Sequence, residues 1–84
     1  MSVLVLNGSE VDRLLRVVEG RSAVRSGHLR EIREQLQLSQ RELARVLGAD
    51  ESTVSRWETG DRLPREDAAD RIGRLLAVLE EAAS

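Results

Sequence analysis

The amino-acid sequence predicts an all-α fold, a five-helix compact domain with at most one short N-terminal strand. Apolar residues recur at three- and four-residue spacing along most of the chain, which is the period of an α-helix. Residues that cap helix starts, such as Ser39, alternate with glycines that end helices, such as Gly48 and Gly60. The 84 residues suffice for one domain with a single small core.

Residues 1–21 are expected to form an N-terminal extension, a short strand or turn followed by a helix. The apolar residues 3–6, with the sequence VLVL, precede the turn pair Asn7-Gly8. They could pair as a short strand, or they could fray or form a helical turn packed on the core. The residues themselves leave these alternatives open.

The first expected helix has Ser9 as its N-cap and Gly20 as its stop, which gives a length of about ten residues. Four apolar side chains recur inside it at helical spacing, namely Val11, Leu14, Leu15 and Val18. A second helix is expected to start at Ser22 or Ser26 and to end near Leu38. Its apolar stripe consists of Leu29, Ile32 and Leu36.

Two short helices joined by a tight turn come next. Ser39 and Glu42 form a complete capping box, and Gly48 ends this third helix in the left-handed conformation. Asp50 is expected to cap a fourth helix, which ends before Gly60. Two helices joined by a glycine-containing turn of about three or four residues cross at a wide angle, so that the first braces the second. The sequence therefore predicts a helix-turn-helix.

A long last helix completes the domain. Pro64 is expected in its first turn, and the acidic Glu66 and Asp67 favour a helix N-terminus electrostatically. Its apolar face consists of Ala68, Ile72, Leu75, Leu76 and Leu79. Residues 22–84 are thus expected to form a helix-turn-helix domain with a long C-terminal helix.

The fourth helix carries side chains that suit base reading. Val54 and Trp57 are predicted to turn inward, and Trp57 is assigned to the core rather than to a stacking platform. The residues outward or on the flanks are then Glu51, Ser52, Ser55 and Arg56. Arginine can hold guanine bidentately, glutamate can accept from cytosine, and serine can serve either way. Glu51 could instead stabilise the start of the helix through a favourable interaction with the helix dipole.

These residues resemble the helix-turn-helix of the phage repressor/Cro family, also called the XRE family. The matching residues are the S-Q-x-x-L-A pattern from Ser39 to Ala44, then Gly48, STVSRWETG from Ser52 to Gly60, and RLP from Arg62 to Pro64. The resemblance covers about residues 28–77 and implies a repressor-like domain that binds double-stranded DNA.

The resemblance also implies roles for single residues. Base edges would be contacted by Glu51, Ser52 and Arg56. The DNA backbone would be contacted by Gln40, Thr53 and Arg62, and we assign Arg41 and Ser55 to the same group. Arg33 would pair with Glu58 inside the domain, which is a structural role.

The composition gives no sign of a metal site, a cofactor, an enzyme or a membrane protein. There is no cysteine and His28 is the only histidine, so we expect no metal site and no cofactor. No phosphate-cradling glycine loop and no nucleophile–base set occurs, so we expect no enzyme. No secretion leader and no apolar run near the roughly 18 residues of a membrane span is found. We therefore expect a cytoplasmic protein with no membrane contact.

The charge of the chain shapes the expected mode of binding. All basic residues are arginine, which suits a GC-rich genome such as that of actinobacteria or their phages; selection for phosphate binding is the alternative. The formal net charge of −2 argues against strong non-specific DNA binding. We therefore expect modest affinity per subunit and a homodimer on a pseudo-palindromic operator.

Two apolar segments are candidates for the dimer surface. The favoured one lies on the last helix and consists of Leu75, Leu76, Val78 and Leu79. The second is residues 3–6 as a pairing strand. The N-terminal extension could instead complete the core or bind a partner protein.

The leading functional hypothesis is a sequence-specific transcriptional regulator, a small repressor of phage or bacterial origin that acts by occupying a promoter. One alternative is an antitoxin, in which the DNA-binding domain regulates its own gene and an extra segment neutralises a toxin. The other alternative is a protein-interaction module that keeps the fold without reading DNA.

Overall fold

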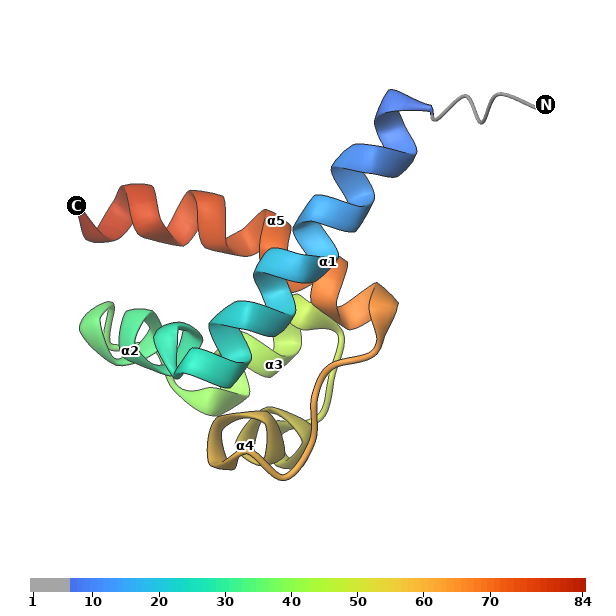
Figure 1. Cartoon of the computed structure of the whole chain (residues 1–84). Coiled ribbons are helices and arrows are strands. Elements are labelled where there is room, and N and C mark those ends of the chain that lie inside the picture. The colour runs from blue at the N-terminus through green and yellow to red at the C-terminus, as the bar shows by residue number, and fades with distance from the viewer. Residues whose placement is uncertain (1–6) are drawn as a thin grey trace, which may run out of the picture.

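The computed structural model describes residues 7–84, which fold into five α-helices around one core (Figure 1). The helices are α1 (Gly8–Ser26), α2 (His28–Gln35), α3 (Gln40–Leu47), α4 (Glu51–Thr59) and α5 (Glu66–Ala83). The described residues contain no strand, and the expected all-α, five-helix fold is confirmed. The proposed strand at residues 3–6 lies outside the described part of the chain.

The first helix differs from the prediction at both ends. Its N-cap is Asn7, whose side-chain oxygen accepts a hydrogen bond from the Ser9 amide at 2.8 Å, so the assignment of Ser9 as the cap was wrong. The helix also continues through Gly20 to Ser26 and ends at Gly27. The predicted stop at Gly20 was therefore wrong, and the predicted boundary between residues 21 and 22 lies within α1. The two-part division itself stays a prediction.

Gly20 has a packing role instead, at the place where α1 crosses α5. A Cβ atom at Gly20 would collide with the backbone carbonyl of Ala69, and one at Gly73 would collide with the carbonyl of Arg16. Each helix thus places a glycine against the backbone of the other. Glycine inside a helix costs about 0.5–1 kcal/mol relative to alanine, and the close contact between the two helices offsets this cost.

A charged cluster fixes the same crossing. Asp70 of α5 is only 4% exposed, and its carboxylate accepts hydrogen bonds from Arg16 at 2.7 Å and from Arg13 at 3.2 Å. Arg74 lies 3.2 Å from the same carboxylate. The hydrogen bond from Arg16 lowers the pKa of Asp70 below its usual range, although burial opposes the shift. The buried acid is therefore ionised and compensated, and it ties α1 to α5.

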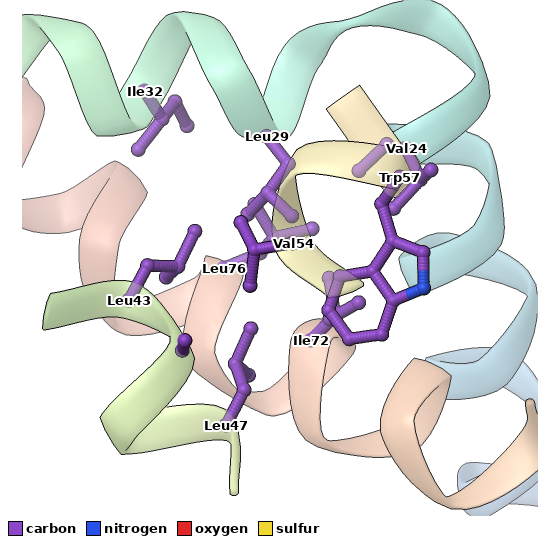
Figure 2. Close-up of a cluster of buried hydrophobic side chains, with 11 residues drawn as sticks. Val24, Leu29, Ile32, Leu43, Leu47, Val54, Trp57, Ile72 and Leu76 are labelled. Carbon is purple, nitrogen blue, oxygen red and sulfur yellow. The ribbon is translucent and has the colours of Figure 1, made fainter. Parts of the chain in front are cut away.

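The main core lies where α2, α3 and α4 pack against α5 and the end of α1 (Figure 2). Its most deeply buried large side chains are Leu29, Leu43, Leu47, Val54 and Ile72. Trp57 is 3% exposed and packs in this cluster. The second helix ends at Gln35, earlier than expected, because the chain turns at Gln37 with a positive φ.

Pro64 lies outside the last helix. The N-cap of α5 is Arg65, so the placement of Pro64 in the first helical turn was wrong. Pro64 is buried in the loop, and its carbonyl accepts a hydrogen bond from the Arg21 guanidinium at 3.2 Å. This hydrogen bond connects the loop that precedes α5 to α1.

The apolar residues of α1 at helical spacing do not face the core. The buried positions of α1 are Val17, Gly20, Ala23 and Val24. Leu14, Leu15 and Val18 are instead 57%, 54% and 63% exposed. The buried side carries glycine, alanine and valine and no leucine, which fits the close approach of the α5 backbone at Gly20.

Substituting Gly20 tests the close crossing. Gly20→Ala should lower the free energy of unfolding by about 1–3 kcal/mol, because the new methyl group meets backbone that cannot move aside. Gly8→Ala is the matched control, since no atom lies within 4 Å of a Cβ there. Urea denaturation measures both variants. A Gly20→Ala protein as stable as the control would contradict the contact.

Candidate nucleic-acid interface

Helix α3 begins with the predicted capping box. The Ser39 hydroxyl accepts a hydrogen bond from the Glu42 amide at 2.9 Å, and the Glu42 carboxylate accepts one from the Ser39 amide at 2.8 Å. The bond from the Ser39 backbone lowers the pKa of Glu42. This reciprocal pair fixes where α3 starts and therefore which side chains of α3 face α4.

The turn between α3 and α4 has the predicted form. Gly48 adopts φ 66°, a left-handed conformation that glycine takes without strain, and the Ala49 amide bonds back to the Ala44 carbonyl at 2.9 Å. Ala44 is 3% exposed and supplies a small residue on the buried side of α3. Asp50 occupies the predicted N-cap position of α4, but its side chain makes no capping bond.

Helix α4 has one buried side and one open side. Val54 is fully buried and Trp57 nearly so, and both lie in the core shown in Figure 2. Ser52 and Arg56 are exposed on the other side, and Glu51 is exposed as the first residue of the helix. Thr53 and Ser55 lie on the flanks with intermediate exposure. Because Val54 and Trp57 hold α4 from behind, the positions from which its outward side chains extend are fixed.

A buried ion pair holds α4 to the rest of the domain. Arg33 of α2 donates two hydrogen bonds to the Glu58 carboxylate, at 2.7 and 2.8 Å, and a third to the Leu38 carbonyl at 2.9 Å. The side chains are 12% and 3% exposed. Burial raises the pKa of Glu58, but the bonds from Arg33 and Gln40 outweigh burial and leave that pKa lowered.

Gln40, at the start of α3, joins this pair. Its side-chain amide donates to the Glu58 carboxylate at 2.9 Å, a contact that the sequence reasoning missed. The bond therefore links α3 directly to α4 through the buried carboxylate. An amide has two N–H donors, so one remains for the predicted phosphate contact, which stays a prediction.

Three exposed arginines belong to the helix-turn-helix or follow it directly. Arg56 is on α4, Arg41 is on α3, and Arg62 is in the loop after α4; all three are exposed. Among residues 7–84, no carboxylate forms an ion pair with any of them. Every ion pair within residues 7–84 includes at least one residue of α1, α2 or α5. Three cationic groups of the motif and of the loop after it are thus left without an acidic partner in the described part of the chain.

The α5 residues predicted for a dimer do not share one surface. Leu76 is 6% exposed and belongs to the core, and Leu75 and Leu79 are half-buried against it. Val78 is 63% exposed on another side of the helix. Leu75 and Leu79 line a shallow depression with Leu38 and Val46. A dimer role for the four α5 residues stays a prediction.

No other site emerges within residues 7–84. That range holds no group of three histidine, aspartate or glutamate side chains that could bind a metal ion. The imidazole of His28 hydrogen-bonds to Glu80 at 2.9 Å. The helices of the same range are too short or too polar to cross a lipid bilayer.

Comparison with known proteins gives one match. The family described as a helix-turn-helix domain matches residues 26–84, which include α2 to α5 and leave out nearly all of α1. No curated protein and no solved structure matches the sequence.

Breaking the buried pair should destabilise the motif. Arg33→Met should lower the free energy of unfolding by about 2–4 kcal/mol, because it leaves the Glu58 carboxylate buried without its cation. Arg30→Met is the matched control on the same helix. Arg30 pairs with Glu34 at the surface, so its loss should cost less than about 0.5 kcal/mol. Chemical denaturation at neutral pH measures both.

The effect should also depend on pH. The pKa of Glu58 is lower in the folded than in the unfolded protein, so its stabilisation is complete above the ordinary glutamate range. It is lost as the pH falls through the folded pKa. The stability difference between wild type and Arg33→Met should therefore shrink in acid, and a difference that grew in acid would contradict the assignment.

Proposed function

This chain belongs to the helix-turn-helix domain family, and from that premise we propose that it is a sequence-specific double-stranded DNA-binding transcription regulator. In this proposal it is a small repressor of phage or bacterial origin that acts in the cytoplasm by occupying a promoter. The supporting observation is that α4 exposes Arg56 and Ser52 while Val54 and Trp57 fix it from behind.

The proposed base contacts follow from the open face of α4. Arg56 has no ion-pair partner among residues 7–84, and a free guanidinium can bond O6 and N7 of guanine together. Ser52 can donate to or accept from a base edge. Glu51, in the first turn of α4, would accept from cytosine. These three residues form the proposed reading surface.

The proposed backbone contacts surround that surface. Arg41 and Arg62 would bind phosphates on either side of α4, because both are exposed and carry charge that no acid of residues 7–84 pairs with. Gln40, Thr53 and Ser55 would add uncharged contacts. Gln40 would couple the phosphate to the position of α4 through its bond to Glu58.

Few phosphate contacts per subunit imply modest affinity. The net charge of −2 gives the whole chain no general attraction for DNA, so binding rests on the arginines beside α4. We propose that a homodimer binds a pseudo-palindromic operator, because two copies of α4 about one DNA turn apart double the contacts. The proposed activity is binding and involves no catalysis.

Two arginine substitutions separate base reading from backbone binding. Arg56→Ala should cost about 1–3 kcal/mol and relax the preference at one base position. Arg62→Ala should weaken binding to all duplexes alike. It should also reduce the slope of log affinity against log salt concentration by the amount that corresponds to about one phosphate contact. The matched control is Arg74→Ala, which removes an exposed arginine of α5 outside the motif.

Fluorescence anisotropy can measure these variants against the best-bound duplex and its single-base-pair changes, over a range of salt concentrations. Equal losses for Arg56→Ala and Arg62→Ala on every duplex would show that Arg56 does not read a base. If Arg74→Ala lowered the affinity for DNA as much as Arg56→Ala, the result would contradict the proposal that DNA is bound by α4.

A further inference from the structure

We propose that two copies of this chain associate through the exposed apolar stripe of α1. This stripe, called the α1 stripe below, consists of the exposed Leu14, Leu15 and Val18 together with Val11, which is only partly exposed. It is distinct from the α5 residues that the sequence favoured. The choice of a second copy as the occupant rests in part on the proposed function, since a twofold operator needs a twofold protein.

The α1 stripe lies mainly on the outward side of α1; its last member, Val18, borders α5, where it lines a depression with Leu76 and Ala77. With about 3.6 residues per turn, its four positions lie on the side of α1 opposite Val17, Gly20 and Val24, which face the domain. Leu14, Leu15 and Val18 are 57%, 54% and 63% exposed, so more than half of the surface of each residue is open to solvent. Spacing of i, i+3, i+4 and i+7 is the pattern by which one helix packs on another.

The stripe is also held rigidly. Gly20 and Gly73 bring the backbones of α1 and α5 together, and the Asp70 carboxylate bonds Arg13 and Arg16 of α1. These contacts lie on the side of α1 away from the stripe. A second molecule therefore meets a preformed surface and does not have to order it.

The position of α1 suits a twofold contact that leaves the DNA face open. Figure 1 shows the N-terminal half of α1 projecting from the domain on the side away from α4. The family match begins at residue 26, so the stripe lies on a helix added to the DNA-binding unit. Pairing of α1 with its copy can leave both α4 helices free.

The exposed area decides the strength of the contact. At these exposed fractions the three large side chains offer roughly 300 Å² per copy, so with flanking residues a twofold contact buries on the order of 1,000 Å². That is the low end for a specific interface. An aliphatic stripe is complementary to itself, which a twofold contact requires. The expected result is a weak, concentration-dependent dimer that two adjacent half-sites would strengthen.

Val18 and Val78 provide a matched pair of variants. Both are valines on long helices and both are 63% exposed, but Val18 is in the α1 stripe and Val78 is on α5. Sedimentation equilibrium of the full chain without DNA, from about 10 μM to 1 mM, should show a monomer–dimer equilibrium for wild type. Val18→Glu and Leu15→Glu should each weaken the dimer at least about tenfold, and Val78→Glu should leave it unchanged.

The outcomes separate this inference from the proposed function. A wild type that stays monomeric at every concentration would overturn the proposed self-association and would indicate that the stripe binds a different protein. A dimer that Val78→Glu disrupts and Val18→Glu does not would also overturn it. Circular dichroism checks that each variant keeps its helices, and Leu15→Gln replaces any variant that does not. A dimer that fails to bind DNA would contradict the proposed function alone.

Discussion

The buried carboxylate of Glu58 is the constraint on which the candidate interface depends. At 3% exposure it cannot remain ionised without partners, and it has two, the Arg33 guanidinium and the Gln40 amide. These partners come from α2 and α3, whereas Glu58 belongs to α4. One charge therefore joins three helices, and the direction in which α4 presents its outward side chains follows from that junction.

A similar device holds the added helix. Asp70 is buried at the crossing of α1 and α5 and is compensated by Arg13 and Arg16. The two junctions act at different places, since one orients the motif and the other orients the apolar stripe of α1. Each junction thus fixes one helix, α4 with its exposed polar residues and α1 with its exposed apolar residues, and these are the two surfaces proposed above for DNA and for a second copy.

Local signals predicted the motif well because they act over a few residues. The capping pair of Ser39 and Glu42, the left-handed Gly48, and the inward Val54 and Trp57 all follow from sequence spacing, and the structure contains each of them. The outward faces of α3 and α4 follow from the same spacing. Their contacts with DNA depend on a partner outside the chain and stay predictions.

The first helix was predicted poorly because its structure depends on a distant helix. Gly20 has the local properties of a helix stop. In the structure it lies inside α1, where the backbone of Ala69 leaves no space for a side chain. Periodicity selects the large side chains of Leu14 and Leu15 as the buried ones, yet the side of α1 that faces α5 carries glycine, alanine and valine instead. No pattern within α1 alone distinguishes its two apolar sides.

Selection of random duplex DNA by the purified chain, at near-physiological salt, tests the central claim most directly. The account predicts enrichment of an inverted repeat whose half-sites are centred about 10 base pairs apart, because two α4 helices would read one face of the duplex. A single enriched half-site would contradict the twofold arrangement. No enrichment at all would contradict DNA reading by α4 and favour a protein-interaction module on the same fold.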